Sequence, residues 1–357
     1  MQRQKGFAKA ANVLLVLLAV ALQWYGHQNR LLDTGDSCNY ISASISFKQS
    51  GQFLSPDGTN YTYWPPLYPI FLSVFGAYLS WVNLILVAVI SFLIINQIKK
   101  VIEDPKLQLI CAASIILGVH LLMIGVFIWS ELLFLLLLLL FIQSIEREKK
   151  PKDLLLTIAL GFLLCLQRNA GIFFIVAAAI YYWDLRKSLL LFFISTSGCI
   201  AWNVYFYSGA AGEHESEFLT HIPNNFNVIA EGLMHSLAPL PGFLFLIVAG
   251  VLAYILGSEK KTRLMALMLL IYIIGISSLF QMIIWDADRY AAVVVPFVMI
   301  TIFRALEIAS ANQTSTVRKV LLILVICWLA YPFSRTLKNA VQWHNVSFTS
   351  YFCADSN

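Results

Sequence analysis

The sequence WSELLFLLLLLLFIQSI, residues 129–145, places a carboxylate at the head of an almost unbroken apolar run. About 20 mostly apolar residues suffice for a helix to cross the hydrocarbon core of a bilayer. The rest of the chain has the same character, because 59% of its 357 residues are hydrophobic, 12% are charged and the mean hydropathy is +0.77. Soluble domains have about 45–50% apolar and about 25% charged residues. A soluble protein, a disordered chain and a disulfide-rich secreted module are therefore excluded, and the sequence predicts an all-α polytopic membrane protein.

Apolar runs along the chain predict eleven transmembrane helices. The first is an uncleaved span that ends at Trp24-Tyr25, although Ala19-Val20-Ala21 resembles a signal-peptidase site. Prolines in the stretch Trp64-Pro65-Pro66-Leu67-Tyr68-Pro69 indicate where the chain enters the membrane again after the first external loop. We expect an interfacial helix there, followed by the second span. The other ten spans are expected at about 81–98, 107–128, 130–145, 154–167, 170–183, 188–207, 237–256, 264–284, 290–306 and 320–333.

The basic residues orient these spans. The formal net charge is +5, and with the N-terminus inside, 18 of the 24 Lys and Arg residues fall on the inner segments. This asymmetry follows the positive-inside rule, so we expect a cytoplasmic N-terminus. The loops 26–64 and 208–236 and a short tail, 334–357, then lie outside. Because the basic residues are spread over six inner segments, the sequence indicates no nucleic-acid site.

The three external segments hold further polar groups. Cys38 and Cys353 lie in such segments and could pair in an oxidising compartment, whereas the other four cysteines lie in apolar runs. The loop 208–236 carries six groups that can bind a divalent metal: Glu213, His214, Glu215, Glu217, His221 and His235. A short acidic loop is more often simply solvated, so we expect no metal or other cofactor. The loop could also be a lid or an acceptor contact.

Charged groups gather on the outer side of this topology. Asp36 lies in the first external loop, Glu131 begins a span, Arg168 follows the end of another, and Arg289 just precedes a further one. Charges inside a bilayer are costly and tend to face a bundle interior or a watery cavity. Any one of these side chains alone could simply extend to the membrane–water interface, but the four together indicate a functional site.

Four stretches carry a resemblance to a known class. They are Gly35-Asp36-Ser37 with Tyr40, Ala43 and Gly51 and then Pro65-Pro66-Leu67-Tyr68-Pro69; Ser130-Glu131-Leu132-Leu133-Phe134; Arg168-Asn169-Ala170-Gly171; and Arg289-Tyr290 with Pro296. In these stretches the chain resembles the GT-C class of membrane glycosyltransferases, in particular bacterial relatives of the protein O-mannosyltransferase family (glycosyltransferase family 39). The resemblance implies one GT-C-like membrane domain over residues 1–357, in a bacterial inner membrane, with the active site and the C-terminus on the periplasmic side.

The resemblance also implies the chemistry. A sugar would pass from a polyprenyl-phosphate donor to an acceptor hydroxyl, with inversion, and the acceptor would be a lipid, a glycan or a protein. Asp36 matches the catalytic acid of the first external loop and is expected to be the general base, with Glu131 as a second catalytic residue. Arg289 and then Arg168 are the candidates for binding the donor phosphate. The other expected substrate contacts are Tyr40, Tyr68, Asp288 and Tyr290.

Some features leave alternatives open. Better-known members often have two adjacent acids in the first loop, whereas Ser37 follows Asp36 here; Asp33 could share the role. A transporter or flippase for lipid-linked sugars would also be polytopic, but transporters commonly show internal repeats and bind at the membrane midplane. A polysaccharide polymerase or ligase, or an inactive subunit, are further alternatives.

Overall fold

The structure is a computed structural model that describes residues 2–28, 30–62, 64–147, 151–206, 224–225, 228, 260–279 and 284–346. The expected span 237–256, most of the loop 208–236 with its six candidate metal ligands, and Cys353 lie outside these residues. Cys38 is disulfide-bonded, whereas Cys111, Cys165, Cys199 and Cys327 are free thiols. The described residues form an all-helical protein, as the sequence predicts.

The helices follow the apolar runs. They are α1 (Gln2–Gly26), α2 (Gly35–Ser50), α3 (Leu67–Phe75), the 3₁₀ helix η1 (Gly76–Tyr78), α4 (Leu79–Val101), α5 (Pro105–Ile116), α6 (Val119–Val126), α7 (Glu131–Arg147), α8 (Pro151–Gln167), α9 (Gly171–Tyr182), α10 (Leu185–Phe206), α13 (Lys260–Leu279), α14 (Ile284–Ser310) and α15 (Ser315–Val346). By length and composition, six helical stretches among the described residues can cross a membrane, and two shorter apolar ones lie at Gly171–Tyr182 and Thr262–Ser278.

The expected span 107–128 corresponds to the candidate membrane span Pro105–Val126, but this stretch is not one continuous helix. It is divided into α5 and α6 at Leu117-Gly118. Gly118 has an extended backbone, and a Cβ there would lie 2.7 Å from the carbonyl oxygen of Ser114. The close approach of the two backbone segments therefore requires glycine at this position, which apolar composition alone does not reveal.

The last helix is longer than expected. The sequence places the end of the last span near residue 333, but α15 continues to Val346, past the internal Pro332. A helix of 32 residues is about 48 Å long, which exceeds the roughly 30 Å hydrocarbon thickness. Its end packs along α1, where the His344 ring stacks on Tyr25 at 4.4 Å. Part of the expected C-terminal tail is thus helical.

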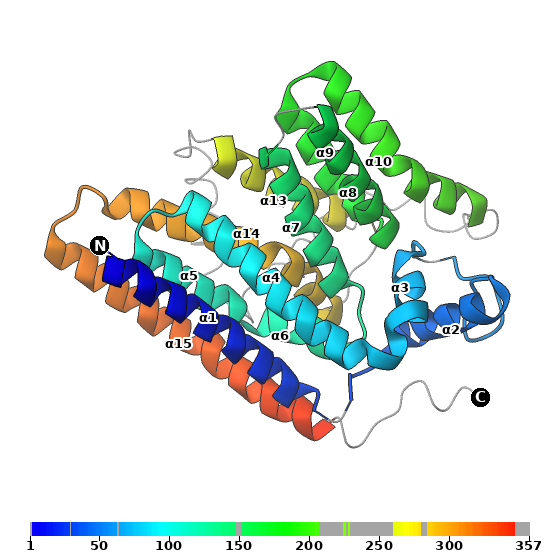
Figure 1. The fold of residues 1–357 in the computed structure, drawn as a ribbon, viewed down its shortest axis with the longest axis horizontal. Coiled ribbons are helices and arrows are strands. Elements are labelled where there is room, and N and C mark those ends of the chain that lie inside the picture. The colour runs from blue at the N-terminus through cyan, green and yellow to red at the C-terminus, as the bar shows by residue number, and fades with distance from the viewer. Residues whose placement is uncertain are drawn as a thin grey trace.

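The helices pack side by side around α14. Figure 1 shows α15 and α1 along one edge, α4 and α7 in the middle, and α8, α9 and α10 on the far side, and the neighbouring pairs are in contact. The apolar run Ala291–Ile300 of α14 is buried throughout, and α14 contacts α4, α5, α6, α7 and α13. This central helix carries Arg289 near its start.

The first external loop is folded rather than extended. Thr34 and Ser37 form a capping box at the start of α2, and Gly51 closes the helix with a left-handed backbone at φ 75°. Helix α2 packs on α3, and both lie at one end of the bundle (Figure 1). This end is where α7 begins, so the loop is held against the head of the leucine-rich helix.

Candidate active site

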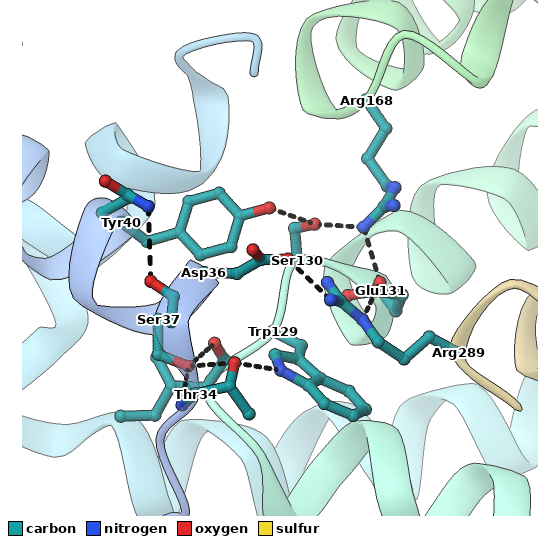
Figure 2. Close-up of polar contacts among 12 residues, drawn as sticks. Thr34, Asp36, Ser37, Tyr40, Trp129, Ser130, Glu131, Arg168 and Arg289 are labelled. Carbon is teal, nitrogen blue, oxygen red and sulfur yellow. Dashed lines mark hydrogen bonds and ion pairs between the residues drawn. The ribbon is translucent and has the colours of Figure 1, made fainter. Parts of the chain in front are cut away.

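Four charged side chains from four separate segments meet where α2 lies against the bundle. Asp36 is in the first turn of α2, Glu131 is the first residue of α7, Arg168 lies in the turn between α8 and α9, and Arg289 is in α14. Figure 2 shows them converging on one point. The structure therefore brings together the four residues that the sequence singles out, although they are up to 253 positions apart.

The four groups alternate in sign. Glu131 Oε1 accepts hydrogen bonds from Arg289 Nε at 2.9 Å and lies 2.7 Å from Arg168 Nη1. Arg289 Nη1 donates to Asp36 Oδ2 at 2.6 Å. Two carboxylates and two guanidinium groups give the cluster a formal charge of zero. Arginine suits this arrangement because its planar fork presents several donors in fixed directions.

Burial differs sharply along this chain of ion pairs. The Glu131 side chain is 1% exposed, and those of Arg168 and Arg289 are each 8% exposed, whereas that of Asp36 is 31% exposed. Buried charges are tolerated only when they are paired. Within the described part of the chain, Glu131 Oε2 has no hydrogen-bond partner. Asp36 is thus the accessible end of the cluster, and Glu131 is its buried centre.

The position of Asp36 is fixed by backbone bonds to the segment before α7. The amide of Leu32 donates to the carbonyl of Val126 at 3.0 Å, and the amide of Ile128 donates back to the carbonyl of Leu32 at 2.8 Å. The Ser37 hydroxyl donates to the carbonyl of Ile128 at 3.0 Å. Both Asp36 and Glu131 lie in the first turn of a helix, where the helix dipole favours a carboxylate.

Trp129 is a site residue that the sequence reasoning missed. Its indole N–H donates to Thr34 Oγ1 at 2.9 Å, and the guanidinium carbon of Arg289 lies 4.4 Å from its ring centroid. A cation over an aromatic face is stabilised by the ring quadrupole. Trp129 therefore connects the cap of α2 to Arg289. The sequence feature that could have predicted this role is its position two residues before Glu131.

We expect Trp129→Leu to lower the free energy of unfolding by about 2–3 kcal/mol, because it removes both the cation–π contact and the hydrogen bond. Trp129→Phe keeps a ring beneath Arg289 and should cost only about 1 kcal/mol. Thermal denaturation in detergent measures both variants. An equal loss of stability in the two would show that the ring does not hold Arg289.

Ser130 and Gln167 were also missed as site residues. The Ser130 hydroxyl accepts from Arg168 Nη1 at 2.7 Å and lies 3.3 Å from the Tyr40 hydroxyl. The Gln167 amide donates to the carbonyl of Ser130 at 3.0 Å. In the sequence, each directly precedes a charged site residue, and only this position could have predicted its role. Together they hold Arg168 in place.

The aromatic candidates form a packed cluster beside the ion pairs. Tyr40 and Tyr68 are buried, with ring centroids 4.9 Å apart, and Tyr40 also contacts Tyr61 and Trp64. Burial raises the pKa of Tyr40 to about 12, so this phenol keeps its proton near neutral pH. Tyr40 reaches the charged cluster through Ser130, whereas Tyr68 packs behind it. Their contact with a substrate stays a prediction.

The two candidates next to Arg289, Asp288 and Tyr290, are both half-buried. The Tyr290 ring lies under Arg168, with 5.4 Å between its centroid and the guanidinium carbon, and its carbonyl accepts from the Tyr272 hydroxyl at 3.1 Å. Asp288 is half-buried on the same turn of α14. No group of three His, Cys, Asp or Glu side chains among the described residues could hold a metal ion.

Comparison with known proteins identifies the fold. No protein-family model matches the sequence, and no curated protein matches it. The crystal structure of ArnT from Cupriavidus metallidurans bound to undecaprenyl phosphate is similar, with a TM-score of 0.55 and 14% identity over 94% of this chain and 77% of that one. The oligosaccharyltransferase of Archaeoglobus fulgidus, in complex with Zn and sulfate, gives a TM-score of 0.57 and 14% identity over 94% of this chain and 53% of its own. These likenesses confirm the GT-C fold expected from the sequence.

Proposed function

We propose that this integral membrane protein is a glycosyltransferase that moves a sugar from a polyprenyl-phosphate donor to an acceptor hydroxyl at the outer face of the membrane. The observation that carries the proposal is the cluster in which Arg289 contacts both Asp36 and Glu131. It offers a base and a cationic phosphate site side by side, within a fold similar to that of a protein crystallised with undecaprenyl phosphate. The acceptor is a lipid, a glycan or a protein.

The transfer needs little from the protein beyond these groups. The acceptor oxygen forms a bond to the anomeric carbon, and the bond from that carbon to the phosphate oxygen breaks with inversion. The electron pair leaves with the polyprenyl phosphate, and the acceptor proton passes to Asp36. A phosphate leaving group needs positive charge rather than a proton donor, and Arg289 supplies it, with Arg168 behind. We assign Glu131 Oε2, which has no hydrogen-bond partner among the described residues, to a substrate hydroxyl.

Two observations support the placing of this site outside the cytoplasm. Glu146, near the end of α7 opposite Glu131, pairs with Lys100 at 2.5 Å. The Lys-rich segment at the end of α4 therefore lies at the other end of the bundle from Asp36, as the positive-inside rule requires of a cytoplasmic segment. In addition, Cys38 on α2 is disulfide-bonded, and disulfides persist in oxidising compartments. We place the protein in the bacterial inner membrane with its site towards the periplasm.

The test is sugar transfer by purified protein in liposomes with a panel of radiolabelled polyprenyl-phosphate sugars. Release of polyprenyl phosphate is the readout, and a variant at Asp36 is the inactive control. Donor consumption by the wild type would identify the sugar. Tight binding of every donor without consumption would instead indicate a transporter or an inactive subunit, and absence of both would overturn the proposal.

We expect Arg289→Ala to weaken donor binding by about 10- to 100-fold, the value of one or two charge-assisted hydrogen bonds. The donor KM should rise more than the acceptor KM, since only the donor carries the phosphate. Arg304→Ala is a matched control, because Arg304 lies in the same helix but pairs with Glu307 at the other end. A larger effect on the acceptor than on the donor would remove Arg289 from the phosphate site.

A further inference from the structure

Both arginines of the charged cluster already have carboxylate partners. Arg168 contacts Glu131 and Ser130, and Arg289 contacts Glu131 through Nε and Asp36 through Nη1. A bound phosphate needs an arginine that is free to turn to it. The Asp36 oxygen that holds Arg289 at 2.6 Å must likewise exchange this partner for the acceptor hydroxyl if it is to take the proton. Both requirements concern the same contact, that between Arg289 and Asp36.

The contact between Arg289 and Asp36 is the ion pair of the cluster that is easiest to break. The Asp36 side chain is 31% exposed, so water can replace Arg289 around it, whereas Glu131 is 1% exposed. Breaking the Glu131 pairs would leave a charge buried without a counter-ion, which is strongly unfavourable. An ion pair with one partly exposed partner costs less to break than one whose partners are both buried. An incoming anion will therefore displace Asp36 rather than Glu131.

We propose that Asp36 and the donor phosphate compete for Arg289, so that donor binding itself releases Asp36 to act as the base. This inference rests on the proposed function and adds to it the order in which donor binding and acceptor activation occur. The free protein keeps its base paired with Arg289, the donor-loaded protein has a free base, and the acceptor is activated only after the donor is bound. The pairing thereby limits proton abstraction in the absence of donor.

The charges balance through one turnover. The donor phosphodiester carries one negative charge and takes the place of Asp36 at Nη1 of Arg289. When the sugar is transferred, Asp36 gains the acceptor proton and becomes neutral, while the departing polyprenyl phosphate gains a second negative charge. Arg289 therefore stays with the phosphate at that moment. Once Asp36 loses its proton to water, it competes for Arg289 again and favours release of the lipid product.

The experiment measures the affinity of the purified protein for undecaprenyl phosphate. If the competition exists, Asp36→Asn should bind this lipid about five- to tenfold more tightly than the wild type, because the competing carboxylate is gone. Asp36→Ala should likewise bind the lipid more tightly than the wild type. Asp57→Asn is the matched control in the same loop, since Asp57 is bonded to Thr59 and exposed, and its affinity should equal that of the wild type.

A double-mutant cycle separates competition for Arg289 from a general effect of negative charge. In an Arg289→Ala background, adding Asp36→Asn should no longer tighten binding, because the contested arginine is absent. Equal or weaker affinity of Asp36→Asn, or tightening that persists without Arg289, would overturn the competition while leaving the proposed function intact. Absence of binding by the wild type and by all variants would overturn the proposed function and the competition with it.

Discussion

Asp36→Asn should lower the rate of sugar transfer by about 10²- to 10⁴-fold, the usual contribution of a positioned general base. The substitution keeps the shape of the side chain and removes its ability to accept a proton. The fold should be retained, because Asp36 is the accessible end of the cluster and the cap of α2 is formed by Thr34 and Ser37. The measurement is release of polyprenyl phosphate at saturating donor, together with thermal stability of the variant.

Two further variants make this result specific. Asp36→Glu keeps the carboxylate but moves it by one methylene, so it should recover only part of the rate. Asp33→Asn tests whether the upstream acid shares the role, and a large loss there would show that it does. If folded Asp36→Asn transferred sugar at nearly the wild-type rate, the assignment of the base would be wrong.

The fold could be predicted well from composition, because membrane helices are long and apolar. The leucine-rich run after Glu131 became α7, and the proline-rich stretch around Pro66 became the start of α3. The break at Gly118 could not be predicted, since it depends on how closely two backbone segments approach. The extension of α15 to Val346 depends on its partner α1, which the local hydropathy of residues 334–346 does not show.

The charged residues of the site could be predicted because charge is rare in this chain and costly in a membrane. The contacts among these residues could not be predicted, because the contact of Arg289 with Asp36 joins residues that are 253 positions apart. The uncharged residues that position them carry no such signal. Trp129, Ser130 and Gln167 are of types common near membrane surfaces and helix ends, and only the hydrogen bonds of the folded chain distinguish them.

Glu131→Ala should lower the free energy of unfolding by about 3–5 kcal/mol, the cost of removing one partner from a buried ion-pair network. Glu131 Oε1 contacts Arg168 at 2.7 Å and Arg289 at 2.9 Å, so both arginines would lose their shared buried counter-ion. We also expect transfer activity to be lost, because neither guanidinium group would keep its position. Glu131→Gln retains one acceptor oxygen and should be less harmful. Thermal denaturation in detergent measures the loss of stability.

Glu146 provides the matched control for this prediction, because it lies in the same helix and is also paired with a cation. Its partner Lys100 has a side chain that is 28% exposed, whereas the two arginines at Glu131 are each 8% exposed. Lys100 can therefore be hydrated when its partner is removed, and only the buried Gln97 amide loses its acceptor. Glu146→Ala should cost about 1–3 kcal/mol, less than Glu131→Ala, and leave transfer unchanged. If the two substitutions destabilised the protein equally, burial of the arginines would not be what makes Glu131 indispensable.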